Sequence, residues 1–297
     1  MTSVLTVSVA TLGIRRYDTF AQFRNHMELI VREAAEAGSR LLLLPELACV
    51  GLLWMDEQAS ETRVPQVSAL YRRALTPRFG EYKRVLSQLA MQYKITIAGA
   101  SFWLEQGGQG ANVGFFFKSD GTIVEQLKLH PTLGERAIYT VGGSEIKVCE
   151  VDGVRVGMLI CYDIQFPEVT RFLVDAGVEV LLVPSLTDER GVWRVHHCAH
   201  ARAVENQLFV CVSPLIGDLG IPVDRPVHGR GAAFIACPID NRFKIQDGTL
   251  ARAAPDVESI LHSSLDLELL RKSRARSEIT QLADRRPDLY SSLLCRT

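Results

Sequence analysis

The chain has 297 residues, of which 47% are hydrophobic and 23% charged, and its formal net charge is -1 at pH 7. A chain of this length can bury a large core, and its balanced charge argues against nucleic acid or an anionic membrane as a partner. No apolar stretch is long enough to span a bilayer, and the N-terminus lacks the basic and apolar regions of a secretion signal, so we predict a cytoplasmic location.

In the first half of the chain, apolar runs with strand spacing alternate with runs of helical spacing. One helix is predicted over 19–37, ending before Gly38, and a second over 77–93. Ser119-Asp120-Gly121 is a hairpin turn signal. Strands are predicted over residues 4–12, 40–44, 95–102, 113–117 and 123–127.

In the second half, further hairpins enter before the alternation returns, and the tail reads as irregular. Strands are predicted over residues 146–151, 154–160, 178–184, 208–212 and 232–236. Helices are predicted over residues 166–176, 192–206 and 265–276. The polar stretch 217–230 is interpreted as a surface loop near a site. This order favours α/β layers, with a mixed sheet or two stacked sheets, in one domain over residues 1–297. We expect the tail from about residue 277 to pack on the domain or on a partner subunit.

Seven cysteines are scattered along the chain without CxxC spacing. They indicate reduced thiols rather than a disulfide framework or a zinc site. Their positions are 49, 149, 161, 198, 211, 237 and 295.

Cys161 stands at the end of the apolar run 154–160, and a segment that could open a helix follows it. A thiol at the tip of a buried strand is held rigidly and can still face a cleft, which is the placement that a nucleophile needs. Free cysteine is also often buried as a small hydrophobic residue, so Cys161 alone leaves both interpretations open.

Three charged residues occur at strand ends or in the loops just beyond them, namely Glu46, Lys128 and Glu135. If the strands form one sheet, their ends can converge on one crevice. Glu46 in a desolvated pocket would be a base for Cys161, and Lys128 with the backbone N–H of Tyr162 would stabilise an oxyanion. Glu135 would fix Lys128 or orient a water molecule. Each residue taken alone is more often an ordinary surface charge.

Four motifs follow one another along the chain: Pro45-Glu46, Lys128-x-His130, Gly134-Glu135 and Cys161-Tyr162-Asp163-x-x-Phe166-Pro167-Glu168. Weaker matches accompany them at Asn112, Ala201-Arg202-Ala203-x-Glu205-Asn206, Gly231-x-x-x-Ile235-x-x-Pro238 and Arg285-Arg286-Pro287-Asp288-Leu289-Tyr290. With these motifs in this order, the chain resembles the carbon–nitrogen hydrolase (nitrilase) superfamily over about residues 4 to 290.

The resemblance implies a four-layer α-β-β-α sandwich that needs neither a metal nor an organic cofactor and that assembles into a homodimer or larger homo-oligomer. It implies Cys161 as nucleophile, Glu46 as general base, Lys128 as the cation that binds the oxyanion, and Glu135 as a supporting glutamate. The expected reaction is hydrolysis of a C–N bond in a small linear amide or carbamoyl compound through a thioester, with release of ammonia or an amine.

The chain also departs from the family pattern. Ala233, Cys237 and Asp240 stand where many members carry Ser, Asp and Gly. Tyr162 follows the nucleophile where true nitrilases usually have Trp, which favours an amidase-type member. The stretch 194–207 resembles the branch in which some members are fused to an acetyltransferase, and we expect no acetyltransferase domain here.

Two alternative functions stay open: a nitrile-hydrolysing enzyme, and a dormant binding or regulatory protein on the same scaffold. His196, His197 and His200 share a predicted helix, but no HExxH pattern accompanies them, so an interface or cleft lining is favoured over a metal site. Trp54 and Phe102 are candidates to line the pocket.

Overall fold

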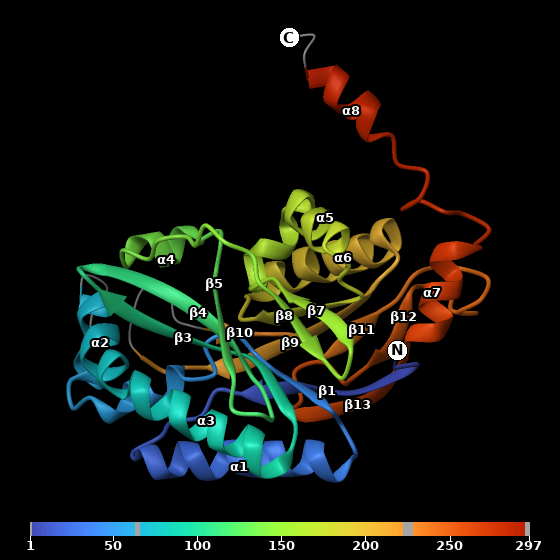
Figure 1. The fold of residues 1–297 in the computed structure, drawn as a ribbon. Coiled ribbons are helices and arrows are strands. Elements are labelled where there is room, and N and C mark those ends of the chain that lie inside the picture. Colours follow the sequence, from blue (N-terminus) through green and yellow to red (C-terminus); the bar gives the residue numbers. More distant parts are fainter. Residues whose placement is uncertain (1, 63–65, 222–227, 295–297) are drawn as a thin grey trace.

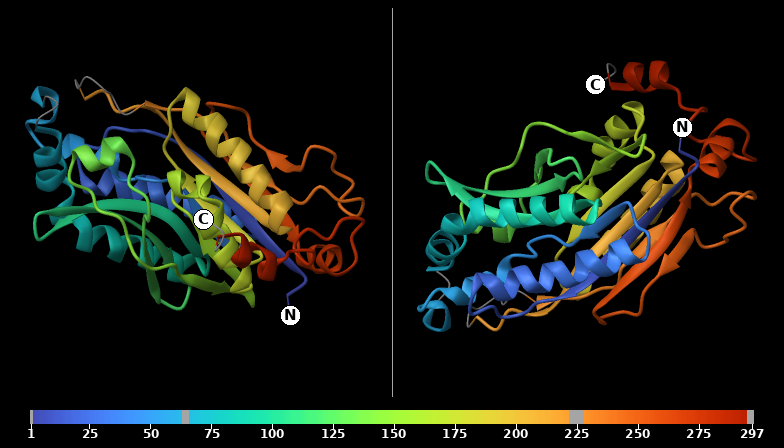
Figure 2. Two further views of the ribbon diagram at one scale, coloured as in Figure 1. Left: turned by 90° about the horizontal axis from the view of Figure 1, so that it is seen from above. Right: turned by 60° about the horizontal axis from the view of Figure 1, so that its bottom comes forward.

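A computed structural model describes residues 2–62, 66–221 and 228–294. Two β-sheets lie face to face, and helices cover the outer face of each (Figure 1 and Figure 2). This is the α-β-β-α arrangement, so the predicted fold class is confirmed. Among the described helices, none combines the length and the hydropathy needed to cross a membrane.

The first sheet is mixed. Its central strands β1, β2 and β3 are parallel, whereas β4 and β5 extend it through antiparallel pairs, and β13 pairs antiparallel with β1 at the other side. In spatial order these strands are β5 (Ile123–Leu127), β4 (Gln109–Phe117), β3 (Thr96–Gln106), β2 (Leu41–Leu44), β1 (Val4–Gly13) and β13 (Ser259–Asp266).

The second sheet has a parallel centre formed by β7, β8 and β9, with antiparallel neighbours on both sides. Its strands are β6 (Val148–Val151), β7 (Val154–Met158), β8 (Val180–Ser185), β9 (Phe209–Asp218), β11 (Phe234–Ala236) and β12 (Thr249–Arg252), with β10 (His228–Gly229) on β9. The two sheets join where β1 pairs with β9, at Leu12–Leu215 and Gly13–Ile216.

The helices divide between the two outer faces. Helices α1, α2 and α3 pack on the first sheet, and α5 and α6 pack on the second. The bounds are α1 (Phe20–Glu36), α2 (Val67–Ala74), α3 (Phe79–Tyr93), α4 (Leu133–Ala137), α5 (Pro167–Asp175), α6 (Glu189–Asn206), α7 (Leu267–Ala275) and α8 (Pro287–Leu294).

Strand β2 shows why the chain forms a sandwich. Successive side chains of a strand point to opposite faces. Leu41 and Leu43 therefore enter the core between the sheets, while Leu42 and Leu44 enter the core beneath α1 and α3. An all-leucine strand is stable here because both of its faces are covered.

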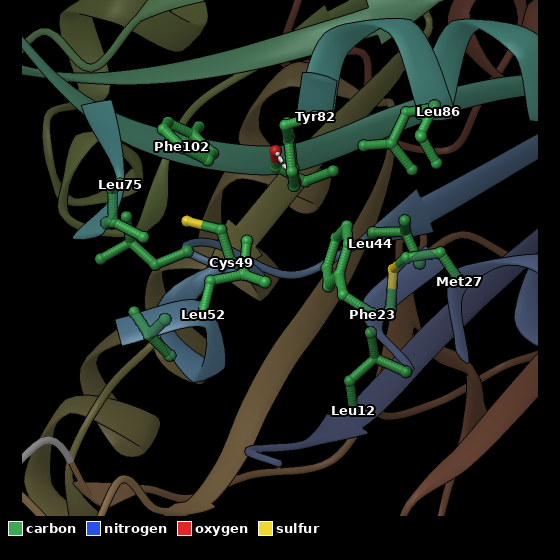
Figure 3. Close-up of a cluster of buried hydrophobic side chains, with 14 of the residues drawn as sticks. Leu12, Phe23, Met27, Leu44, Cys49, Leu52, Leu75, Tyr82, Leu86 and Phe102 are labelled. Carbon is green, nitrogen blue, oxygen red and sulfur yellow. Dashed lines mark hydrogen bonds between the residues drawn. The ribbon is translucent and has the colours of Figure 1, made fainter. Parts of the chain in front are cut away.

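The core beneath α1 and α3 packs aromatic rings among leucine and other aliphatic side chains (Figure 3). The ring of Phe23 on α1 stacks on that of Tyr82 on α3, with 5.4 Å between their centroids. The Tyr82 hydroxyl donates a hydrogen bond to the carbonyl of Ala100 at 2.7 Å, so this buried polar group is paired.

Each of the three residues that depart from the family pattern packs against or bonds to other parts of the fold. Ala233 and Cys237 belong to the core between the sheets. Asp240 is buried and accepts a hydrogen bond from the Ser273 hydroxyl on α7 at 2.9 Å. It also contacts Ser277, so an aspartate at this position fastens α7 and the start of the tail to the second sheet.

Most predicted elements are present with shifted ends, but α2, α4, β10, β12, β13 and α8 were not predicted. Strand β13 alternates half-buried and exposed positions at a sheet edge, so its apolar signal is weak. The tail, predicted to be irregular, forms α8, which projects from the body in Figure 1. Before it, Arg285 makes an ion pair with Asp175 on α5.

Two sequence predictions fall partly on residues that the structure does not describe. Of the predicted loop 217–230, residues 222–227 lie outside the described residues, as does Cys295. The described cysteines are free thiols.

Replacing Phe23 by alanine should lower the free energy of unfolding by about 3–5 kcal/mol, because it leaves a cavity between α1, α3 and the first sheet. Arg24→Ala, on the exposed side of the same helix, should change it by less than about 0.5 kcal/mol. Urea unfolding followed by circular dichroism measures both. Equal effects of the two substitutions would contradict this account of the core.

Candidate active site

The four side chains singled out in the sequence lie together, at the ends of strands from both sheets. Glu46 follows β2 and Lys128 follows β5, whereas Cys161 follows β7 of the other sheet. Lys128 Nζ lies 2.7 Å from Glu46 Oε1 and 2.7 Å from Glu135 Oε2. The Lys128 side chain is only 2% exposed, so both ion pairs are shielded from water.

Asn112, on β4, ties the two carboxylates together. Its Nδ2 donates hydrogen bonds to Glu46 Oε1 and to Glu135 Oε1, both at 2.9 Å. The second oxygen of Glu46 accepts a hydrogen bond from the backbone N–H of Leu186 at 2.9 Å. Leu186 follows β8, so this bond joins the second sheet to a side chain of the first. The orientation of Glu46 is therefore fixed at both oxygens.

Glu135 was predicted to lie in a loop, and this prediction was wrong: it lies in the short helix α4. Thr132 caps the helix by accepting a hydrogen bond from the Glu135 N–H at 3.3 Å, while Glu135 Oε2 accepts from the Thr132 N–H at 2.8 Å. The Thr132-x-x-Glu135 spacing is that of a capping box, so the signal was present in the sequence. The cap also aims the Glu135 carboxylate at Lys128.

Cys161 opens a 3-10 turn that covers Cys161–Gln165. Its φ angle is 51°, in the left-handed region that costs a residue with a side chain of order 1–3 kcal/mol. The side chain is buried, Sγ lies 3.7 Å from the carbonyl oxygen of Leu186, and Cys161 lines the same cavity as Glu46. Tyr162 is the second residue of this turn, near the end of a helix where backbone N–H groups are least engaged by the helix itself.

Asp163 connects this turn to the segment that carries Lys128. Its carboxylate accepts hydrogen bonds from the N–H groups of Leu129 at 3.1 Å and His130 at 2.8 Å. It also accepts from the N–H of Ile160 at 3.2 Å, just before the cysteine. The His130 ring stacks on Phe166 with 3.7 Å between centroids. One buried aspartate thus fixes the backbone beside Cys161 relative to the backbone beside Lys128.

The charges in this cluster shift one another. Burial raises the pKa of Glu46, and Lys128 only partly opposes that effect. Burial also works against ionisation of Glu135, yet Lys128 and Asn112 hold its pKa below the ordinary value. Burial, followed by the charge of Glu46, raises the pKa of Cys161 well above that of a free thiol. Burial would lower the pKa of Lys128, but the surrounding anionic groups, Glu46 first, raise it. The resting cluster therefore holds an ammonium group and a protonated thiol.

Two cavities meet at the thiol. The inner cavity has a volume of about 250 Å³. It is lined by Glu46 and Lys128, together with the aromatic side chains of Tyr71 and Trp103. The outer cavity, of about 720 Å³, begins at Cys161 and opens between α4 and the start of α6. The space is large enough for a small-molecule ligand.

Sequence reasoning chose the wrong aromatic residues for the pocket. Trp54 donates a hydrogen bond to the Leu219 carbonyl at 2.8 Å, and Phe102 is in the core beneath α3, whereas Trp103 lines the inner cavity. The pairing register of β3 shifts between Gly99 and Phe102, so simple alternation does not give the direction of the side chains that follow.

The histidine cluster lies apart from both cavities. His196 and His200 pack against Phe234 of β11, and His200 Nε2 is 3.0 Å from the Thr249 hydroxyl. Within the described residues, no group of three or more His, Cys, Asp or Glu side chains is arranged to hold a metal ion.

A family model described as carbon-nitrogen hydrolase matches residues 6–274. The chain belongs to the carbon–nitrogen hydrolase family. Carbon–nitrogen hydrolases are enzymes that act on C–N bonds, and the resemblance inferred from the four motifs is confirmed.

Individual members of the carbon–nitrogen hydrolase family agree with the match. The chain is 32% identical over 286 residues to the probable hydrolase YhcX of Bacillus subtilis, covering 96% of this chain but 54% of that protein. It therefore spans about half the length of that relative. It is 26% identical to the omega-amidase NIT2 of Danio rerio, with 89% of each chain covered. The crystal structure of Nit3 from Saccharomyces cerevisiae, a member of the nitrilase superfamily, superposes with a TM-score of 0.72 at 21% identity, covering 96% of this chain and 98% of Nit3.

Lys128→Met should lower the free energy of unfolding by about 3–5 kcal/mol, because it leaves two buried carboxylates without their cation. The same substitution in a Glu46→Gln/Glu135→Gln background should cost much less, since no buried charge is then left unpaired. Denaturant unfolding of the four proteins completes the double-mutant comparison. Equal costs in both backgrounds would contradict the ion-pair account.

Proposed function

We propose that this protein is a cysteine-dependent amidohydrolase, which hydrolyses a non-peptide C–N bond in a small linear amide or carbamoyl compound. The observation that carries the proposal is the buried contact of Lys128 with Glu46 and Glu135 at the cavity that Cys161 lines. A nucleophile, a base and a cation within one enclosed space are the groups that acyl transfer requires.

In the first half-reaction, Glu46 takes the proton of Cys161 as Sγ forms a bond to the carbonyl carbon. The raised pKa values of both groups favour proton transfer during the attack over a standing thiolate. Lys128 and the N–H of Tyr162 stabilise the oxyanion. Protonated Glu46 then gives its proton to the leaving nitrogen, the C–N bond breaks, and ammonia or an amine departs.

In the second half-reaction, water attacks the thioester, and Glu46 accepts a proton from that water. The C–S bond breaks, the carboxylic acid leaves, and the sulfur regains its proton. Glu135 acts through Lys128: its carboxylate keeps the ammonium group charged and in place, at 2.7 Å. Asn112 holds both carboxylates in the orientation that this exchange needs.

Relatives support an amide rather than a nitrile as the substrate. The Danio rerio relative is an omega-amidase, and it matches over most of both chains. The residue after the nucleophile is Tyr162, as in amidase-type members of the family. A panel of short aliphatic amides, ω-amides, carbamoyl amines and the corresponding nitriles, assayed for ammonia release, compares the two chemistries directly.

Cys161→Ala should abolish amide hydrolysis while leaving the unfolding free energy near that of the parent. Cys198→Ala, a partly buried thiol on α6, is the matched control and should keep full activity. Ammonia release and circular dichroism are measured on both proteins. Hydrolysis by the Cys161→Ala protein would refute the thioester pathway.

The rate at which iodoacetamide alkylates Cys161 should fall on acidification through a pKa above the ordinary value of 4.5 for glutamate, because burial raises the pKa of Glu46 and protonated Glu46 cannot accept the thiol proton. Glu135→Gln should move this acid limb to lower pH, since the charge of Glu135 raises the pKa of Glu46. Mass spectrometry of the labelled cysteine across a pH series gives the acid limb of the parent protein and of the variant. An acid limb that moves to higher pH in Glu135→Gln would contradict the assignment of this limb to Glu46.

A further inference from the structure

Helix α2 forms one side of the inner cavity, where it contributes Tyr71 to the lining. Two ion pairs connect this helix to its neighbours. Arg73 Nε lies 3.0 Å from the carboxylate of Asp56, and Arg72 pairs with Glu105 of β3. Both arginines follow Tyr71 directly on the helix, so these pairs fix the part of α2 that carries the tyrosine.

Tyr71 is buried, yet its hydroxyl makes no hydrogen bond within residues 2–62, 66–221 and 228–294. The residue is 6% exposed, and its ring meets that of Trp103 edge-on, with 5.4 Å between the centroids. Burial, and then the charges of Cys49 and of the two site glutamates, raise the pKa of Tyr71, so the hydroxyl stays protonated. Buried polar groups are rarely left without a partner, and this one is therefore available to a bound molecule.

The other polar side chains that line the inner cavity are engaged. Thr132 Oγ1 donates a hydrogen bond to Glu135 Oε2 at 2.9 Å, and the Trp103 N–H donates to the Thr140 hydroxyl at 2.8 Å. Every carboxylate oxygen of the two glutamates accepts at least one hydrogen bond. The ammonium group makes two ion pairs and keeps its third N–H for the oxyanion of the proposed reaction. Among the described side chains of this wall, the Tyr71 hydroxyl is the neutral polar group that remains for a ligand.

The two cavities indicate which atom of the substrate lies beside Tyr71. Glu46 lines the inner cavity and not the outer one, whereas Cys161 lines both. In the proposed reaction the leaving nitrogen takes its proton from Glu46, so this nitrogen lies on the inner side of the sulfur. The water of the second half-reaction gives a proton to the same carboxylate and therefore occupies the same place. The Tyr71 wall thus borders first the nitrogen and then the water.

We propose that the Tyr71 hydroxyl contacts the reacting atoms: its oxygen accepts an N–H of the leaving nitrogen, and later an O–H of the attacking water. This inference rests on the proposed amidohydrolase function. An amide nitrogen gains an available lone pair only when the carbonyl carbon becomes tetrahedral. Held by one N–H, the nitrogen turns this lone pair toward protonated Glu46, takes the proton, and departs as the C–N bond breaks. Water held by one O–H gives its other proton to Glu46 and directs a lone pair at the thioester carbon.

Tyr71→Phe removes the hydroxyl and keeps the ring against Trp103. Tyr82→Phe is the matched control, because the Tyr82 hydroxyl is paired with the Ala100 carbonyl in the core and lines neither cavity. The urea midpoint should stay constant in Tyr71→Phe and fall in Tyr82→Phe, since only the second change leaves a buried acceptor without its donor. A midpoint lowered by Tyr71→Phe as much as by Tyr82→Phe would show a structural hydroxyl and contradict the inference.

The kinetic test compares propanamide with methyl propanoate, which gives the same acyl group but has a leaving oxygen without hydrogens. The value of kcat/KM reports formation of the thioester. For propanamide it should fall about tenfold in Tyr71→Phe, as expected for one lost hydrogen bond, and for the ester it should change little. Tyr82→Phe should keep the ratio of the two values. Equal losses on amide and ester, or no loss on the amide, would overturn the inference and leave the proposed function standing.

Binding without turnover separates the contact from the reaction. In the Cys161→Ala protein, NMR titration should show propanamide binding about fivefold weaker when Tyr71→Phe is added, with the affinity for methyl propanoate unchanged. Adding Tyr82→Phe should leave both affinities unchanged. Propanamide binding that does not depend on the Tyr71 hydroxyl would count against the contact. Binding that does depend on it, without hydrolysis of any amide by the protein with Cys161 intact, would support the contact and refute the proposed function.

Discussion

The arrangement of this protein depends on one ammonium group, that of Lys128, enclosed between the carboxylates of Glu46 and Glu135. Charges removed from water are costly unless every one of them is matched. Two carboxylates against one lysine leave an excess negative charge, and the protein meets it with neutral donors. Asn112 serves both carboxylates, and the Leu186 N–H serves the remaining oxygen of Glu46. Few alternative side chains would satisfy these bonds together.

This charge balance sets the state of the sulfur. In many cysteine enzymes, a nearby cation lowers the pKa of the thiol until a thiolate persists. Here burial raises the pKa of the Cys161 thiol, and the negative charge of Glu46 beside it adds to the effect, while Lys128, shared by two carboxylates, opposes it only in part. The proposed chemistry therefore relies on Glu46 as the base at the moment when the thiol attacks. A protonated thiol in the resting protein is also less readily oxidised, because oxidation begins from the thiolate.

The four-layer sandwich and the clustering of the four residues were predicted from the resemblance of the ordered motifs to the carbon–nitrogen hydrolase superfamily, because each residue taken alone is an ordinary charge or thiol. Leu41–Leu44 is apolar at every position, as a strand covered on both faces must be, and the residues beyond its end were natural site candidates. The alternation of helices and strands predicted α/β layers, with a mixed sheet or two stacked sheets. Where the signal was weak, prediction failed: β13 at the sheet edge is only half buried, and α8 has little of the body beneath it.

Other features could not be predicted because they arise from tertiary contacts. Whether Trp103 or Phe102 faces the cavity depends on a register shift inside β3. The role of the Leu186 backbone depends on how the two sheets are stacked, and a backbone N–H leaves no trace in the residue type. The short helix α4 is a different case, since Thr132 and Glu135 carried a capping signal that the loop interpretation overlooked.

The hydrogen bonds from Leu186 to Glu46, and from Leu129 and His130 to Asp163, cross from one sheet to the other. The candidate active site is thus divided between the two sheets, and its geometry depends on how the sheets are stacked. Met158 and Leu182 lie deep in the core between the sheets and line neither cavity, yet their packing helps set how the two sheets are stacked. Substitutions in the core between the sheets can therefore lower activity without changing any side chain of the site. Temperature-sensitive variants are expected in that core as well as in the cavities.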